Sequence, residues 1–364
     1  MAKKLSKNIQ SLNKKKIAIS ILAILTAILS IELVLRLLSI GSSEKDNLIT
    51  KSNNPVLSYE LKKNYTREIK NSENVLIRYH SNSEGFRGEE LAEYDSGSNL
   101  LCLGDSTTFG WGMQQENTFC SQLSTNLSTA NSVISNPINL AVPGYNLEQV
   151  KEVYRVNSKK YFGNWVILGY LLNDVSPTAD WEWDEAKNRI SLKNEPKLQE
   201  GSYKGPFGGR FPWAKFLDTV RLYNLAIRPL LIPPKETIDL YHANNKSEFE
   251  IYQQVYFDPN FKNGWESKKQ VLNELNIMTK ANNQRLLVIV FPLAYQLINN
   301  TNTNPQDKIT TYLEENGIEY IDLLPFFKET KLEAKKLFSD NAHPTVLGHK
   351  IIGDKISQII LGSI

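Results

Sequence analysis

The stretch Asn99-Leu100-Leu101-Cys102-Leu103-Gly104-Asp105-Ser106 decides the fold that this sequence predicts. Its apolar run, residues 100–103, is typical of a strand that is buried on both faces of a parallel sheet. The run ends in Gly-Asp-Ser, three residues that favour turns. Ser106 is therefore expected at the carboxyl end of a central strand, which is where open α/β sheets place their ligand sites.

Strands and helices are predicted to alternate along the rest of the chain. Strands are expected at 99–104, 138–142, 165–171, 285–291 and 319–323. Helices are expected at 118–127, 147–161, 267–281, 306–316 and 345–361. This alternation predicts the α/β class, with a parallel sheet flanked by helices.

A second segment, Asp340-Asn341-Ala342-His343-Pro344, supplies a carboxylate and an imidazole three residues apart. The Ser106 hydroxyl is a weak nucleophile until a base takes its proton. His343 is suited to be that base, and Asp340 can hold its other ring nitrogen. Alone, Gly-Asp-Ser is more often a plain turn and Asp-x-x-His more often the start of a helix. Together the two segments predict a nucleophile site.

Attack on an ester also needs hydrogen-bond donors for the oxyanion that forms. Gly144 follows the predicted strand 138–142 and offers its backbone N–H. Asn173 follows the apolar run 166–172 and offers its side-chain amide.

These four blocks resemble, in the same order, those of the SGNH (GDSL-type) hydrolases of the membrane-anchored bacterial type. The resemblance covers roughly residues 97–362 and implies a three-layer, flavodoxin-like parallel sheet flanked by helices. It implies that Ser106 is the nucleophile, His343 the base and Asp340 its partner. It also implies an oxyanion hole formed by Ser106, Gly144 and Asn173.

The third block departs from the family pattern, in which a glycine usually stands two residues before the asparagine. Here Gly169 stands four residues before Asn173. Asp105 and Asp174 are expected to be structural, as a turn residue and as an anchor of its loop. His349 is expected to be a surface or packing residue, and His80 and His242 ordinary polar positions.

The N-terminal region contains an apolar run from Ile17 to about Ile40. A helix of this length can cross a ~30 Å hydrocarbon core. Six lysines precede it: Lys3, Lys4, Lys7, Lys14, Lys15 and Lys16. The positive-inside rule then keeps residues 1–16 in the cytoplasm and exports the rest. A cleaved signal peptide is the alternative, but the run is long and no small-x-small site follows it cleanly, so we expect an uncleaved signal anchor at 17–40.

The remaining organisation is a linker and small β lead-in at 41–96 and a hydrolase domain at 97–364. Within the lead-in, 41–55 is expected to be the linker and 56–90 to form strands. The segment Asn82-Ser83-Glu84-Gly85-Phe86-Arg87-Gly88 resembles one found upstream of the nucleophile in membrane-anchored members of the family. The alternative is a tight turn built on its two glycines.

A long insertion, 176–264, interrupts the α/β alternation beside the Asn173 loop. A helix is expected at 221–231. Four tryptophans lie in it or at its margin: Trp181, Trp183, Trp213 and Trp265. They could stack on sugars or acyl chains, or they could form a small satellite core.

Composition excludes several classes. The net charge of +3 comes with no basic stripe, so no nucleic-acid partner is expected. Four histidines and two cysteines without close ligand pairs predict no metal, and no cofactor is expected. The segment 258–264 only faintly resembles a calcium loop and is rejected. Cys102 and Cys120 are expected to be buried thiols, although export would allow a bridge.

The sequence thus predicts a single-pass membrane protein whose extracytoplasmic domain is a serine esterase with a Ser-His-Asp acyl-enzyme mechanism. Acyl esters of envelope glycans, chiefly O-acetyl esters, are the expected substrates. The alternatives are a lipid esterase or lysophospholipase, a glycan O-acyltransferase, and a non-catalytic envelope assembly module.

Overall fold

The fold is that of a computed structural model. It describes residues 16, 19–24, 26–35, 48–71, 74–91, 99–130, 132, 136–175, 181–185, 189–192, 256–257, 264–298 and 304–362. The chain divides into two units, one made of 46–196 and 235–364, the other of 1–45 and 197–234. All residues discussed at the site belong to the first unit.

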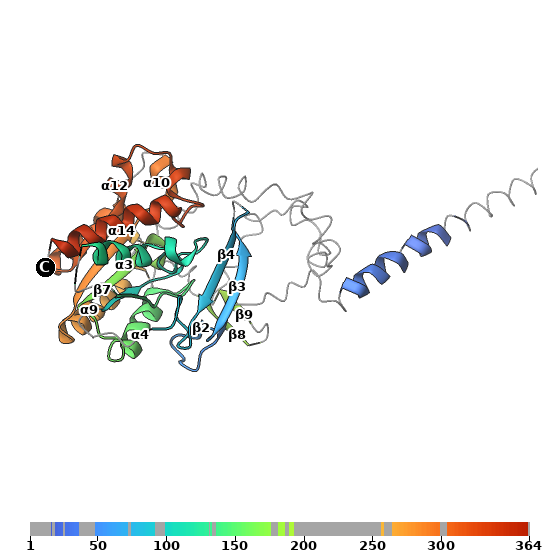
Figure 1. Ribbon diagram of the computed structural model, residues 1–364, viewed down its shortest axis with the longest axis horizontal. Coiled ribbons are helices and arrows are strands. Elements are labelled where there is room, and N and C mark those ends of the chain that lie inside the picture. The colour runs from blue at the N-terminus through green and yellow to red at the C-terminus, as the bar shows by residue number, and fades with distance from the viewer. Residues whose placement is uncertain are drawn as a thin grey trace, which may run out of the picture. The chain divides into compact units, whose positions relative to one another are not determined.

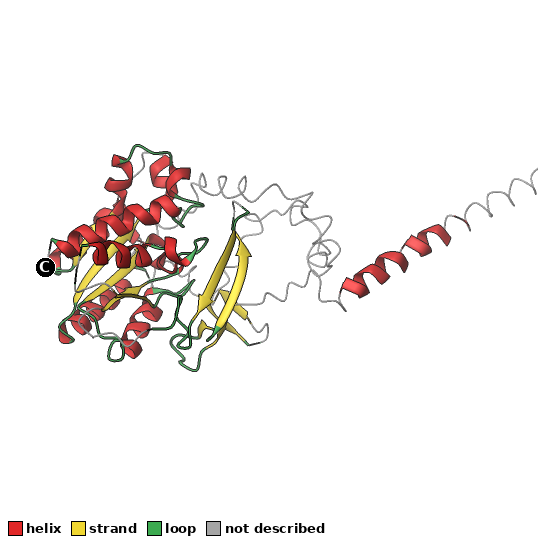
Figure 2. Cartoon of the chain, in the orientation of Figure 1, coloured by secondary structure: helices red, strands yellow, loops and turns green. Residues whose placement is uncertain are grey.

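A five-stranded parallel sheet forms the centre of the first unit (Figures 1 and 2). Its strands are β5 (Asn99–Leu103), β6 (Asn136–Asn139), β7 (Trp165–Leu171), β10 (Arg285–Phe291) and β11 (Glu319–Asp322). They lie in the order β11-β10-β7-β5-β6, the flavodoxin-like order 2-1-3-4-5 read from the other edge. All seven residues of β7 are buried, as expected for a strand covered on both faces. The predicted α/β fold with a parallel sheet is confirmed.

Helices lie on both sides of this sheet (Figure 2). The longer ones are α3 (Phe119–Thr129), α4 (Leu147–Asn157), α9 (Trp265–Ala281), α11 (Asn304–Glu315) and α14 (Val346–Leu361). α3 packs against α14, and α4 packs against α9. Shorter helices are α2 (Ser106–Phe109), α10 (Ala294–Ile298), α12 (Leu323–Glu329) and α13 (Ala334–Leu337), with 3-10 turns η2 (Gln115–Asn117) and η3 (Leu172–Val175).

Local sequence explains where α4 begins. The Asn146 side chain accepts a hydrogen bond from the N–H of Gln149, and the Gln149 side chain accepts one from the N–H of Asn146, which together form a capping box. Leu147, Val150 and Tyr154 then recur at helical spacing and are buried. The helix ends at Asn157, four residues before the predicted end.

Four short strands form the lead-in before β5. β1 (Ile49–Lys51) pairs antiparallel with β2 (Tyr59–Leu61), and β3 (Tyr65–Lys70) with β4 (Leu76–Ser81). The expected β lead-in is present. The prediction that 41–55 is all linker is wrong, because β1 lies inside it and finds its partner in β2.

The described part of the insertion is a hairpin of β8 (Trp181–Asp184) and β9 (Arg189–Leu192). The helix predicted at 221–231, Trp213, His242 and the segment 258–263 lie outside the described residues. Trp265 belongs to α9 and is buried in the core, where its ring meets Tyr256 and Tyr312. Trp265 is therefore a core residue.

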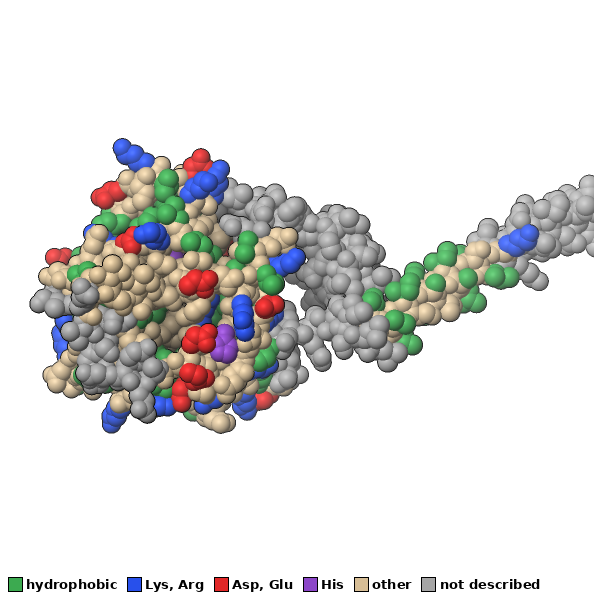
Figure 3. Space-filling model, viewed as in Figure 1, with side chains coloured by type: hydrophobic (Ala, Val, Ile, Leu, Met, Phe, Trp, Pro, Cys, Tyr) green, Lys and Arg blue, Asp and Glu red, His purple; other side chains and the backbone are tan. Residues whose placement is uncertain are grey.

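Residues 19–24 and 26–35 are helical, and most of their large apolar side chains are exposed (Figure 3). Among the described residues, no helix is both long enough and apolar enough to span a membrane. Residues 1–15, 17, 18, 25 and 36–47 of the predicted tail, anchor and linker lie outside the described residues. On the face shown in Figure 3, acidic and basic side chains of the first unit are interspersed.

Candidate active site

Three side chains from two distant segments of the chain form one line of hydrogen bonds. The ring of His343 lies between Ser106 and Asp340, with Nε2 at 2.8 Å from Ser106 Oγ and Nδ1 at 2.7 Å from Asp340 Oδ2. An ionised carboxylate can only accept, so Nδ1 carries the proton and Nε2 accepts from the Ser106 hydroxyl. This tautomer is the one a general base needs to take the serine proton.

Asp340 is held in its ionised form. Burial alone would raise its pKa, but the charge of His343 and the hydrogen bonds from its ring and backbone lower the pKa to about 2. Its second oxygen, Oδ1, accepts from the N–H of Ala342 at 2.9 Å and of His343 at 2.8 Å. One carboxylate therefore fixes both the backbone and the ring of the base. About a fifth of the His343 side chain, 19%, is exposed, so a substrate can reach it.

The loop that carries His343 is tied to the start of α10, the short helix that follows β10. The N–H of Ala294 donates to the carbonyl of Asn341 at 2.9 Å. The N–H of Ser339 donates to the His343 carbonyl at 2.8 Å and closes the loop on itself. Thr345 then caps α14 by accepting from the N–H of Gly348.

Ser106 is the first residue of α2, directly after β5. Asp105 caps this helix, since its Oδ1 accepts from the N–H of Thr107 at 2.8 Å. Gly104 has a φ of +151°, a region that favours glycine, and a Cβ there would lie 2.3 Å from Thr108 Oγ1. The chain can thus turn sharply after β5, so that Ser106 lies at the carboxyl end of the parallel strands.

Gly169 has a packing role that explains its position. A Cβ at Gly169 would lie 2.0 Å from Thr108 Oγ1, so only a glycine leaves room for this side chain of α2. Gly104 and Gly169 thus accommodate the same threonine from two neighbouring strands. This is a physical reason for a glycine four residues before Asn173.

Gly144 and Asn173 follow the two strands that flank β5. Gly144 has a φ of +81°, and its turn is joined to the nucleophile loop because the N–H of Val142 donates to the Gly104 carbonyl at 3.3 Å. Asn173 lies in η3, directly after β7. Its side chain lies outside what the structure describes, so its part in an oxyanion hole stays a prediction.

Asp105 and Asp174 are the buried carboxyl groups of these loops. Burial raises the pKa of both groups, and the charge of Asp105 raises that of Asp174 further. Asp174 accepts from the N–H of Leu171 at 2.9 Å. The expectation that Asp105 is a turn residue and Asp174 an anchor of its loop agrees with these contacts.

Arg87 is the residue near the site whose role the sequence did not reveal. Its guanidinium is buried, and burial lowers its pKa to about 10. It donates to the carbonyls of Phe109, Gly110 and Met113, the loop that leaves the Ser106 helix, and it lies 4.6 Å from the Phe109 ring centre. The 82–88 segment is indeed a turn, in which Asn82 accepts from the N–H of Phe86, and this turn delivers Arg87 to the nucleophile loop.

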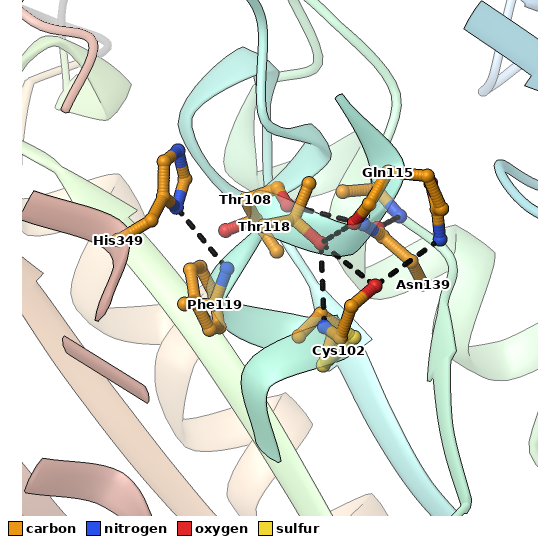
Figure 4. The surroundings of a disulfide bond; sticks show 10 residues. Cys102, Thr108, Gln115, Thr118, Phe119, Asn139 and His349 are labelled. Carbon is orange, nitrogen blue, oxygen red and sulfur yellow. Dashed lines mark hydrogen bonds between the residues drawn. A yellow bond between two sulfur atoms is a disulfide. The ribbon is translucent and has the colours of Figure 1, made fainter. Parts of the chain in front are cut away.

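Cys102 and Cys120 form a disulfide, so the prediction of two free thiols is wrong. Their Cα atoms are 6.5 Å apart, within bridging range, because α3 packs directly on the sheet beside β5. The bridge ties the strand before Ser106 to α3 (Figure 4). In the same figure His349, which is fully buried, accepts from the N–H of Phe119 through Nδ1 at 3.2 Å. His349 is thus a packing residue rather than a surface one.

His80 lies on β4, where its Nδ1 is 2.8 Å from Thr66 Oγ1. Within the described residues, no group of three or more His, Cys, Asp or Glu could hold a metal ion.

One comparison with known proteins identifies the family of this chain. The model of the GDSL-like lipase/acylhydrolase family matches residues 102–351, more than half of the chain, and this range includes Ser106, Asp340 and His343. The chain belongs to this family and is an ester hydrolase of the SGNH type. The search of curated proteins finds no match.

The solved structures that resemble this chain include two esterases and a GDSL-like lipase. A catalytic mutant of an acetylxylan esterase from Geobacillus stearothermophilus is 15% identical, over 73% of this chain and 95% of that one, with a TM-score of 0.42. A psychrotrophic esterase from Pseudoalteromonas is 12% identical over 73% and 97%, with a TM-score of 0.39. A GDSL-like lipase from Bacteroides thetaiotaomicron is 12% identical over 75% and 93%, also at 0.39. At these scores the family assignment rests on the family match alone.

Proposed function

We propose that this protein is a serine esterase of the cell envelope that removes O-acetyl groups from glycans through an acyl-enzyme at Ser106. The observation that carries the proposal is the hydrogen-bonded line from Asp340 through His343 to Ser106. Removal of any member of such a line should nearly abolish turnover, because the three act as a unit.

The proposed reaction has two steps. Ser106 Oγ attacks the ester carbonyl while His343 Nε2 takes its proton, and the glycan hydroxyl leaves with that proton as the acyl-enzyme forms. A water, deprotonated by His343, then attacks the acyl carbon and releases acetate and free Ser106. Each attack places negative charge on the carbonyl oxygen, and we assign its stabilisation to the N–H groups of Ser106 and Gly144 and the amide of Asn173.

We also propose that residues 17–40 anchor the enzyme in the membrane and that 41–364 lie outside the cytoplasm. The support is the apolar run preceded by six lysines, together with exposed apolar side chains such as Ile19, Leu22 and Leu29 in the described helix. Protease added to intact spheroplasts should digest the large domain. A protected domain would contradict the orientation, and a mature chain that begins after Ile40 would contradict the anchor.

A panel of p-nitrophenyl esters, from acetate to longer acyl chains, tests the activity and the acyl preference together. We expect acetate to be cleaved best, with turnover lost in Ser106→Ala. A preference for long chains would favour the lipid esterase. The absence of turnover on every ester in a correctly folded protein would favour the non-catalytic assembly module. Mass spectrometry of products formed with a glycan acceptor would reveal acyl transfer in place of hydrolysis.

A further inference from the structure

A cavity of about 410 Å³ lies elsewhere on the surface, but one of about 380 Å³ adjoins the Gly144 turn. Four elements that are far apart in the sequence surround this second cavity, and one of them is the start of α9, with Ser267 and Lys268. The lead-in loop contributes Val56 and Ser58, the start of α4 contributes Asn146 and Glu148, and β8 contributes Trp181. Its volume falls in the range of small-molecule sites.

The polar walls of the cavity are fixed by their own contacts. Lys268, whose side chain is only 5% exposed, lies in the wall and donates to both oxygens of Glu148, at 2.8 and 2.7 Å. Gln149 donates from its amide to the carbonyl of Leu57 at 2.8 Å. Because Lys268 and Glu148 neutralise each other, this pair adds no net charge to the cavity. Glu182 also lines the cavity, and a carboxylate can accept hydrogen bonds from hydroxyl groups. Such walls suit a neutral, hydroxyl-bearing ligand better than a hydrocarbon chain.

Trp181 connects the cavity to the reaction centre. Its side chain is half-buried, and a Cβ at Gly144 would lie 3.2 Å from Trp181 Cδ1. The indole of Trp181 therefore borders the turn to which we assign an oxyanion donor, and Trp181 is also one of the residues that line the cavity. A ligand in the cavity would therefore lie against a residue that also borders the Gly144 turn.

We propose that this cavity binds a sugar ring of the acylated glycan, with the ring against the indole of Trp181 and its hydroxyl groups on the polar wall. An aromatic face opposite fixed polar side chains satisfies both the apolar and the hydroxyl-bearing surfaces of a neutral sugar. The inference rests on the proposed function, because it assigns the glycan-binding part of the same site.

The test compares two substrates in the full-length protein: p-nitrophenyl acetate, which has no sugar, and a partially O-acetylated chito-oligosaccharide. Trp181→Ala should lower kcat/KM for the oligosaccharide about tenfold more than for p-nitrophenyl acetate, a difference of about 1.4 kcal/mol. Trp181→Phe, which keeps an aromatic face, should recover part of this loss. Most of the loss in kcat/KM for the oligosaccharide should come from a higher KM rather than from a lower kcat.

A second variant avoids any loss of the Trp181 packing. Val56 is 49% exposed and lines the cavity, so Val56→Trp should fill the cavity without disturbing the core. Like Trp181→Ala, this variant should lower the ratio of kcat/KM for the oligosaccharide to kcat/KM for p-nitrophenyl acetate. Trp183→Ala is the matched control, because Trp183 lies on the same strand and is not among the residues that line the cavity. Its ratio should equal that of the wild type.

Binding measured by calorimetry in a Ser106→Ala background separates recognition from turnover. The same oligosaccharide should bind, and Val56→Trp should weaken this binding about tenfold. If the wild type cleaves the oligosaccharide and both cavity variants keep the wild-type ratio, this inference is wrong while the proposed function stands. Selective loss of activity on p-nitrophenyl octanoate in these variants would assign the cavity to an acyl chain and overturn it. A wild type that cleaves p-nitrophenyl acetate but neither cleaves nor binds the oligosaccharide would overturn the proposed substrate and this inference together.

Discussion

The loop that carries Ser106 and the loop that carries His343 are held by different kinds of contact. The nucleophile loop depends on residues far away in sequence, since Gly169 leaves the space that Thr108 fills and Arg87 binds the carbonyls of 109–113. The base depends on a residue three positions away, because Asp340 accepts from both the backbone and the ring of His343. The position of the nucleophile is therefore a property of the whole fold, and that of the base largely a property of one short segment.

Because the two loops are held differently, substitutions in them should affect the stability and the activity of the enzyme to different degrees. Substitutions that support the nucleophile loop should lower both, because they also disturb packing between the lead-in, α2 and the sheet. Substitutions in the segment 339–344 should lower activity more than they lower the free energy of unfolding, and the contribution of Asp340 to stability should depend on pH.

The largest effect is expected for the members of the hydrogen-bonded line. Ser106→Ala and His343→Ala should each lower kcat by about 10⁶, and the double variant should be no worse than either. Kinetics on p-nitrophenyl acetate and thermal melts measure both properties. Near-normal turnover in either folded variant would show that these residues are not the active site.

Asp340→Asn should lower kcat by about 10⁴, because an amide no longer enforces the tautomer in which Nε2 accepts from Ser106. Its effect on stability should depend on pH. The lowered pKa, about 2, means that Asp340 stabilises the fold fully above the usual value of 3.8 and loses this contribution as the pH falls toward 2. Asp354→Asn, on the surface of α14, is the matched control. Equal kcat for the wild type and Asp340→Asn would show that the base needs no carboxylate.

Asn173→Ala should lower kcat by about 10²–10³ with a smaller change in KM, as expected when one oxyanion donor is lost. The measurement is steady-state kinetics, with Asn126→Ala on α3 as a control far from the strand ends. An unchanged kcat would mean that another group fills the position.

Arg87→Lys sharpens the comparison between the two loops. Lysine keeps the charge but cannot bind three carbonyls as the guanidinium fork does, so carbonyls left without a donor should destabilise the fold by about 1–3 kcal/mol. A shifted Ser106 should lower kcat about tenfold with little change in KM. Arg78→Lys, exposed on β4, is the control, and guanidinium ion added to Arg87→Ala should restore part of kcat. A lowered melting temperature with unchanged kcat in the folded enzyme would limit Arg87 to a structural role.

The smallest effect on activity is expected for His349, whose substitution should change stability alone. Burial lowers the pKa of His349 to about 3, with the charge of Arg87 acting in the same direction. The unfolded chain takes up this proton near pH 6.5, so stability should fall with pH from about 6.5 toward 3, with a slope of up to about 1.4 kcal/mol per pH unit. His349→Gln, which can still accept from the Phe119 N–H, should flatten this slope. The same slope in both proteins would contradict the assignment.

The features predicted best from the sequence were those set by local pattern. The runs 165–171 and 285–291 form strands with the predicted bounds, because a strand buried on both faces is continuously apolar. Four ordered blocks with strands before three of them led to the family and to the Asp340–His343–Ser106 line.

The features that the sequence did not reveal depend on tertiary packing. Nothing local shows that Cys120 lies within bridging range of Cys102, since this depends on how α3 lies on the sheet. Arg87 lies in a segment with two glycines. The sequence did not indicate its partners, because they are backbone carbonyls, which have no sequence signature. Trp181 was one of four candidate tryptophans, and only the fold places it against Gly144.

The central claim is that Ser106 is the single nucleophile of this enzyme. Covalent labelling tests this claim most directly. Full-length protein treated with a fluorophosphonate and analysed by peptide mass spectrometry should carry one adduct, on Ser106, with loss of esterase activity in proportion to labelling. The adduct should form far more slowly in His343→Ala, because the base that activates Ser106 is gone. An adduct on a different serine, or full activity retained after Ser106 is labelled, would contradict the account.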